Sequence, residues 1–150
     1  MINIFDIANW FLNKESMPLQ KLQKLCYYTQ AWSYALMNEP LIDSEFEAWA
    51  IGPISRKLHD KYAGDGFNLL SPDAAEVSFT AETEEFLGSV WLTYGDHTGN
   101  SLMVLSQGEP PLIYARAGYD SLAECTNEIA HDDMRRYYRL IYSGDLDVEV

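Results

Sequence analysis

Three histidines each stand beside an aspartate, and such pairs are candidate metal ligands. The pairs are His59 with Asp60, His97 with Asp96, and His131 with Asp132. Imidazole and carboxylate groups bind zinc and related ions, so a metal-dependent hydrolase is one hypothesis. Against it, no two of the histidines are four residues apart on one predicted helix, and the chain is rich in acids. We therefore expect no metal and no cofactor.

The sequence also lacks the short motifs of nucleotide-binding and hydrolytic enzymes. Cys26 could act as a thiol nucleophile, but it lies in an apolar helical stripe between Leu22 and Thr29. A free cysteine in such a stripe usually packs as a small core residue. The adjacent acids Asp132 and Asp133 are typical of a solvated helix start. No set of residues predicts an active site, and we expect a protein that is not an enzyme.

The charge of the chain restricts its partners. It has 10 Lys+Arg and 23 Asp+Glu, a formal net charge of −13, and no Lys or Arg between Lys61 and Arg116. Such a surface repels nucleic acid and anionic membranes, and it attracts basic proteins. The alternative interpretation is that the negative charge only keeps a small protein soluble.

The N-terminal residues suit a cytoplasmic protein. Residues 1–14 are apolar but lack a basic start and are interrupted by Asp6 and Asn9, unlike a signal peptide or a membrane span. Cys26 and Cys125 show no disulfide or metal-ligand spacing, which fits a reducing compartment.

The periodicity of apolar residues and the positions of helix-capping and helix-breaking residues predict a mainly α fold. We expect a compact single-domain bundle of about six helices with a short β-strand or hairpin near residues 41–51. The predicted helical segments are 4–12, 18–37, 54–62, 81–94, 100–105, 113–117 and a last helix that begins near Asn127. The domain covers residues 1–143, and residues 144–150 form an acidic, flexible tail.

The longest predicted helix, residues 18–37, carries two kinds of surface. Its leucines form an apolar stripe, and the opposite side presents Gln23, Tyr27, Gln30 and Tyr34. Tyrosine with amides is typical of protein interfaces, so this side is a candidate for partner binding. The alternative is that the helix is central in the bundle and that both of its sides are buried.

Two segments of the chain resemble the Panacea domain family, the phage-associated GepA-like group that also includes the SocA-type antitoxin. The first is LQKLQKLCYYTQAW at residues 19–32, and the second is EPLIDSEFEAWAIGPISRKLHDKY at residues 39–62. The resemblance covers residues 8–62 with order and spacing kept. The second segment matches at Phe46, Glu47, Ala48, Trp49, Gly52 and Pro53.

Three positions depart from the family pattern. Gln107 stands where a histidine is common, Ile113 lies in the region of a usual tryptophan, and Ile51 replaces a frequent aromatic residue before Gly52. If these positions contact a partner, the departures bear on which partner is bound and not on the fold.

The resemblance implies a helical antitoxin that neutralises a cognate toxin protein, which we expect to be basic. Family members neutralise toxins mainly by direct binding, and the SocA type delivers its toxin to a cytoplasmic protease as an adaptor. For an adaptor, residues 145–150 are the candidate recognition element. We expect no nucleic-acid or membrane partner. The candidate partner-binding residues are Gln23, Tyr27, Gln30, Tyr34, Trp49, Gly52 and Pro53.

Overall fold

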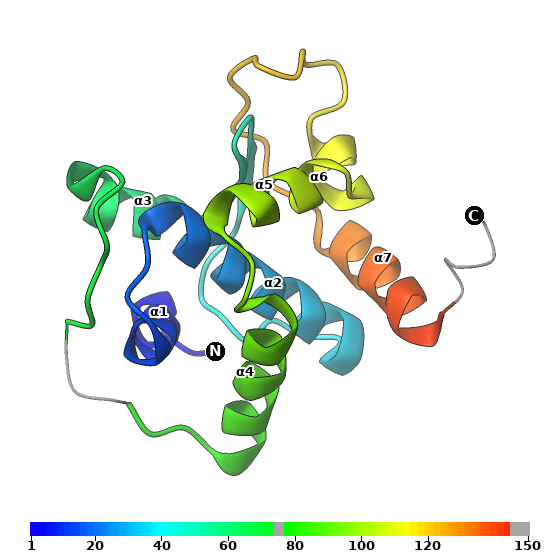
Figure 1. Cartoon of the computed structure of the whole chain (residues 1–150). Coiled ribbons are helices and arrows are strands. Elements are labelled where there is room, and N and C mark those ends of the chain that lie inside the picture. Colours follow the sequence, from blue (N-terminus) through cyan, green and yellow to red (C-terminus); the bar gives the residue numbers. More distant parts are fainter. Residues whose placement is uncertain (74–76, 145–150) are drawn as a thin grey trace.

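The structure, a computed structural model, describes residues 1–73 and 77–144 (Figure 1). Within them it has seven α-helices, one 3-10 turn and one antiparallel hairpin, which confirms the expected mainly α fold. The elements are α1 (Ile4–Lys14), α2 (Leu19–Met37), β1 (Glu47–Trp49), β2 (Gly52–Ile54), α3 (Arg56–Tyr62), the turn Ala63–Asp65, α4 (Ala81–Tyr94), α5 (Gly99–Gln107), α6 (Pro110–Ala115) and α7 (His131–Ser143).

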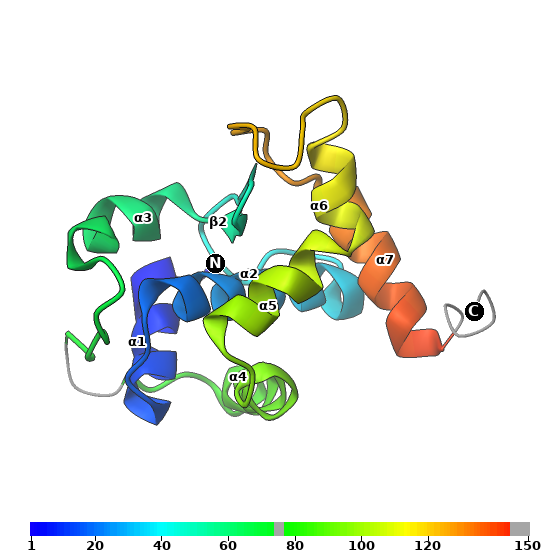
Figure 2. The same cartoon turned by 45° about the horizontal axis from the view of Figure 1, so that its top comes forward.

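Helix α2 lies at the centre of the molecule. It packs against α1, α4, α5, α7 and β2, and Figures 1 and 2 both show it enclosed by these elements. Its most extensive contact is with α7. Leu22 and Leu25 are buried on one side, and Gln23 and Tyr27 are buried on the other. The interpretation in which both sides of this helix are buried is therefore the one that the structure supports.

Short polar residues fix the starts of the peripheral helices. The side chain of Asn3 accepts a hydrogen bond from the Phe5 N–H at the start of α1. Thr80 caps α4 through the Thr83 N–H, and Thr98 caps α5 through the Ser101 N–H. Each cap satisfies an N–H group that the first helical turn leaves unpaired. Helix α2 ends at Met37, and the next residue, Asn38, adopts a left-handed conformation with φ 58°.

The last helix begins at His131, later than the predicted start near Asn127. The residues before it extend the sheet. The Ala48 N–H donates to the Asn127 carbonyl at 2.7 Å, and the Ile129 N–H donates to the Phe46 carbonyl at 2.8 Å. Ile129 is buried by this pairing, which gives its apolar side chain a role other than helix packing.

A second local difference concerns Pro110 and Pro111. We expected this helix to cover residues 113–117, and the structure starts it earlier, with both prolines as the first residues of α6. At this position the missing proline N–H costs no hydrogen bond.

Two expectations concern the C-terminal residues and membrane-spanning helices. Residues 145–150, named as a recognition element, lie outside them. In residues 1–73 and 77–144, no helix has the length and apolar character needed to cross a bilayer.

Candidate functional site

The two glutamines of α2 bind backbone groups inside the molecule. Gln23 accepts from the Ser55 N–H at 2.8 Å and donates to the Ser55 carbonyl at 3.0 Å. Gln30 accepts from the N–H groups of Leu41 and Ile42 and donates to the Ile42 carbonyl, with distances of 2.9–3.0 Å. Both side chains thus fasten α2 to the segment that leads into and out of the hairpin.

The two tyrosines of the same side are also buried. Tyr27 makes edge contacts with the rings of Phe46 and Tyr138, and its hydroxyl lies 3.1 Å from that of Tyr138. Tyr34 is stacked on His131 with ring centroids 4.5 Å apart. These four α2 side chains form internal contacts in this fold, and we do not carry them into the partner surface proposed below.

Gly52 and Pro53 are buried as well. Gly52 has φ +107°, and a Cβ there would lie 2.8 Å from Lys24 Cε. Glycine is favoured here, because residues with a side chain rarely adopt this backbone conformation, and a Cβ would also require Lys24 to shift. Trp49, the remaining candidate, is half-buried and lines the surface cleft described next.

The three histidines have separate environments. His59 makes an edge contact with Trp49, His97 Nδ1 lies 2.9 Å from Ser101 Oγ, and His131 Nε2 lies 2.6 Å from Glu45. Within the part of the chain that the structure describes, no group of three or more His, Cys, Asp or Glu is arranged to hold a metal ion. The metal-dependent hydrolase therefore gains no support from the geometry.

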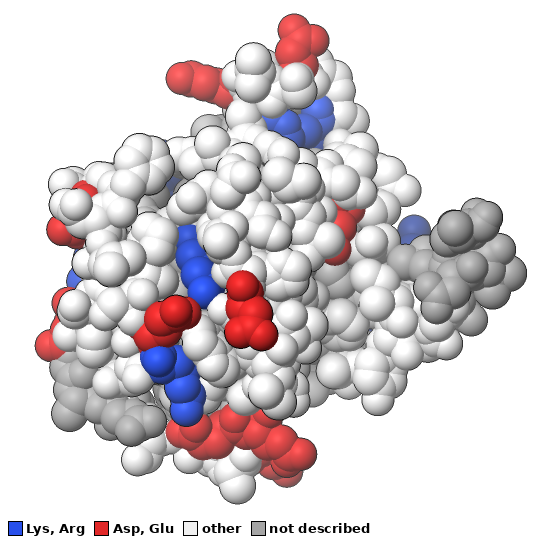
Figure 3. Space-filling view, viewed as in Figure 1, with Lys and Arg blue, Asp and Glu red and all other residues white. Residues whose placement is uncertain are grey.

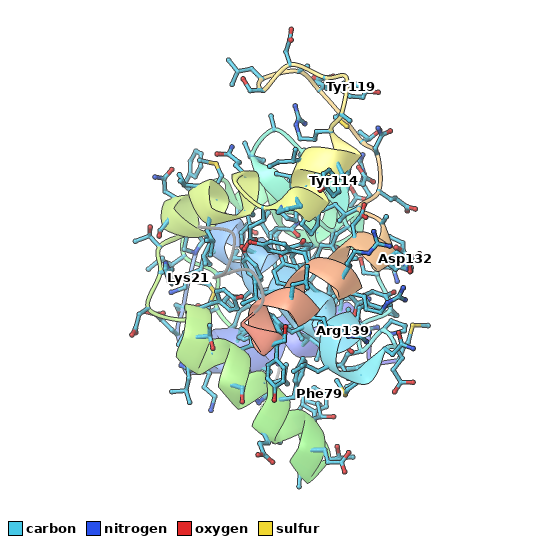
Figure 4. All side chains as sticks on the ribbon, turned by 90° about the vertical axis from the view of Figure 1, so that its right-hand side faces the viewer. Lys21, Phe79, Tyr114, Tyr119, Asp132 and Arg139 are labelled. Atoms are coloured by element: carbon cyan, nitrogen blue, oxygen red, sulfur yellow. The ribbon has the colours of Figure 1, made fainter. Side chains whose placement is uncertain are left out.

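The hairpin tip and the loop after α6 form an apolar projection, which we call the hairpin face. Figure 1 shows both segments extending together from the helical body, and Figure 4 labels Tyr119 in the loop above α6. The exposed fraction is 48% for Ile51, 48% for Ile113 and 89% for Leu122. The hairpin face is defined here by Trp49, Ile51, Ile113, Tyr119 and Leu122.

Two clefts flank the hairpin tip. One of about 330 Å³ lies between Trp49 and Ile51 on the hairpin and Leu122 to Thr126 on the loop. The other, of about 580 Å³, is lined by Gln107, Ile113 and Tyr119. Ala50 and Leu122 border both clefts, so the tip forms a ridge between two hollows. A ridge with apolar hollows suits the packing of side chains from another protein.

Arg116 holds the loop against the hairpin. Its guanidinium donates to the carbonyls of Ala48, Asp120 and Ala123 at 2.8–2.9 Å, and the residue is 9% exposed. Gln107 adds a bond to the Ala50 carbonyl at 2.8 Å. A planar guanidinium can serve three acceptors in fixed directions, which a lysine ammonium on a flexible stem does less well.

Replacing Arg116 with lysine is expected to free the loop while the helical body stays folded. The free energy of unfolding should fall by about 1–2 kcal/mol, because several charged hydrogen bonds to carbonyls are weakened. Amide hydrogen exchange should become faster in residues 117–126 and stay unchanged in α2. Arg136→Lys, an exposed arginine of α7, is the matched control. Unchanged exchange in the loop would contradict the role given to Arg116.

The charges around the hairpin face are mainly acidic. Asp120 and Glu124 are exposed on the loop, and Figure 3 shows acidic side chains at the outer edge of the projection. Arg56 is bound to Glu47 at 2.8 Å and lies over the Trp49 ring, 5.0 Å from its centroid. The apolar residues are thus framed by carboxylates that attract a positively charged partner.

The sequence singled out one residue of the hairpin face, Trp49, as a contact. Arg116 and Leu122 were missed, because nothing local marks a loop that is held by contacts distant in the chain. A usable signal was present in the departures from the family pattern. Ile51 lines one of the two clefts at the tip, and Gln107 and Ile113 line the other.

The fold and this surface define a class: a mainly helical domain with an exposed apolar face suited to binding another protein. A comparison with models of protein families identifies the family of the chain. The model of the family "Antitoxin SocA-like, Panacea domain" matches residues 22–111, and the chain belongs to this family. No curated protein and no solved structure matches the chain. The matched region runs from α2 to the first residues of α6 and includes the hairpin tip.

Proposed function

We propose that the protein is an antitoxin that neutralises a cognate toxin by direct protein–protein binding through the hairpin face. Family membership supports the antitoxin role. Inhibition of this kind needs a contact surface and no chemical step, so we infer a non-catalytic protein that acts on its toxin in the cytoplasm.

The observation that carries the proposal is the exposure of large apolar side chains at one projecting end. Leu122 is 89% exposed, and Ile51 and Ile113 are each 48% exposed, beside two clefts. Contiguous exposed apolar surface rimmed by polar residues is typical of interaction sites. Since Asp120 and Glu124 border it and the net charge is −13, the proposed toxin is basic.

Charge substitutions on the hairpin face test the proposal. Ile51→Asp and Leu122→Asp should each weaken binding of the toxin at least tenfold, because a buried unpaired carboxylate would replace an apolar contact. The melting temperature should stay unchanged, since both side chains are exposed. The probe is the product of the neighbouring gene, assayed for co-purification and for rescue of growth.

The matched control is Leu92→Asp on α4, where the leucine is 83% exposed but lies outside the hairpin face. It should bind and neutralise like the wild type. Full rescue of growth by the Ile51 and Leu122 variants would exclude this surface. Absence of any bound or neutralised toxin would overturn the proposed function itself.

A further inference from the structure

Glu109, at the junction of α5 and α6, points its carboxylate toward two tyrosines from other helices. Its Oε1 accepts hydrogen bonds from the hydroxyl of Tyr28 on α2 at 2.7 Å and from that of Tyr138 on α7 at 2.8 Å. The residue is 6% exposed and makes no side-chain cap to α6. Glu109 therefore connects three helices through one oxygen atom.

An aromatic group surrounds this carboxylate. The ring of Tyr28 is stacked on that of Tyr94 with centroids 4.1 Å apart, and it meets the ring of Tyr138 edge-on at 6.0 Å. Tyr137 packs against Tyr138 and is half-buried, so the group extends to the surface of α7. Figure 3 shows a small acidic area at the surface between α6 and α7.

The second carboxylate oxygen of Glu109, Oε2, differs from the first in its contacts. Among the described residues no hydrogen bond to Oε2 occurs, and the ion pairs there do not include Glu109. Oε2 is also absent from the fully enclosed unpaired atoms, which in residues 1–73 and 77–144 consist of Lys24 Nζ alone, so it keeps contact with solvent. Burial of the carboxyl group raises the pKa of Glu109 to about 7.

A purely structural role explains the contacts of Oε1 but not the choice of a carboxyl group. A glutamine carbonyl would accept the same two hydroxyl groups without the cost of burying an ionised group. What a carboxylate adds is the capacity to bind a cation at its free oxygen. Aromatic rings beside a carboxylate are the combination by which proteins hold ammonium and guanidinium groups.

We propose that Glu109 and its surrounding tyrosines form an acceptor site for one lysine or arginine side chain of the bound protein. This inference rests on the proposed function, since the toxin supplies the cation, and it adds a second contact outside the residues that define the hairpin face. Bound there, the cation would pair with Oε2 and keep the carboxylate ionised.

A carboxyl titration without any toxin tests the site. The pKa of Glu109 is measured by carbon-13 NMR in methylguanidinium chloride and in sodium chloride at matched ionic strength. We expect the pKa of Glu109 to be lower by about half a unit in methylguanidinium, because a bound cation favours the ionised form. The ring signals of Tyr138 should shift to saturation in the wild type and stay unchanged in Glu109→Gln.

Glu124, an exposed carboxylate on the hairpin loop, is the control within the same spectra. Its carboxyl carbon signal at neutral pH should be the same in both salts. The proposal is overturned if the pKa of Glu109 is the same in both salts, or if the Tyr138 signals shift equally in Glu109→Gln. The titration uses no toxin, so a negative result would overturn the Glu109 site alone. The proposed function is tested separately, by toxin binding of the hairpin-face variants.

Discussion

Replacing Gln30 with leucine should lower the free energy of unfolding by about 3–5 kcal/mol, although leucine is the more apolar residue. The side chain is 2% exposed and bonds the N–H groups of Leu41 and Ile42 and the carbonyl of Ile42. Leucine would leave these three backbone groups buried and unpaired, and each such group costs about 1–3 kcal/mol. Urea denaturation at neutral pH measures the effect.

The matched control is Gln20→Leu, on the same helix but half-buried, which should change the free energy of unfolding by less than about 1 kcal/mol. The pair of variants also separates the two interpretations of α2. Unchanged stability of Gln30→Leu with lost toxin binding would mean that this side of the helix faces a partner, against the internal contacts described above.

Replacing Lys24 with methionine should have a large effect of opposite sign. The Lys24 side chain is fully buried, and its Nζ has no hydrogen-bond partner among the described residues. Desolvation lowers the pKa of Lys24 from 10.5 to about 8. Methionine has a similar volume and no charge to bury, so the free energy of unfolding at pH 7 should rise by about 3 kcal/mol.

The gain should depend on pH in a defined direction. Below pH 8 the lysine is charged in both the folded and the unfolded state, so the full cost of burying the ammonium is present. As the pH rises from 8 toward 10.5, the folded state holds a neutral amine while the unfolded state stays charged. The wild type then gains stability, and the advantage of the methionine variant shrinks.

Urea denaturation at pH 7 and near pH 9.5 measures this difference, with Lys14→Met, an exposed lysine of α1, as the control. The control variant should show no pH-dependent difference from the wild type over this range. If Lys24→Met were no more stable than the wild type at pH 7, the ammonium must have a partner that balances its burial.

The helices were predictable where an apolar periodic segment is bounded by residues that begin or end helices. The range 81–94 agrees with α4 at both ends, since Thr80 caps it and Gly95 follows it. The range 18–37 agrees closely with α2, which starts after Pro18 and ends before Asn38. Which side of α2 is buried was not predictable, because the partners of Gln30 and Gln23 lie up to 14 and 32 residues away in the chain.

The candidate site was predictable only in part, for a similar reason. Trp49 lies in a segment that resembles the family pattern. Leu122 lies in a loop that is positioned by the hydrogen bonds of Arg116 to three carbonyl groups. The apolar Ile129 also led to a predicted start of the last helix that was too early, because a single apolar residue fits a helix start and a strand equally well. Its pairing with Phe46 is visible only in three dimensions.

The partnership of α2 with α7 has a consequence for synthesis of the protein. Helix α2 ends at Met37, and its main neighbour begins only at His131. At a translation rate of about 5–20 residues per second, the ribosome needs on the order of 5–20 s to make the intervening chain. During that interval the Tyr27 and Tyr28 side of α2 has no α7 to cover it, and Tyr138 cannot yet join Glu109. The core is completed only after α7 has been translated, so a message cut short before α7 would yield a product without this core.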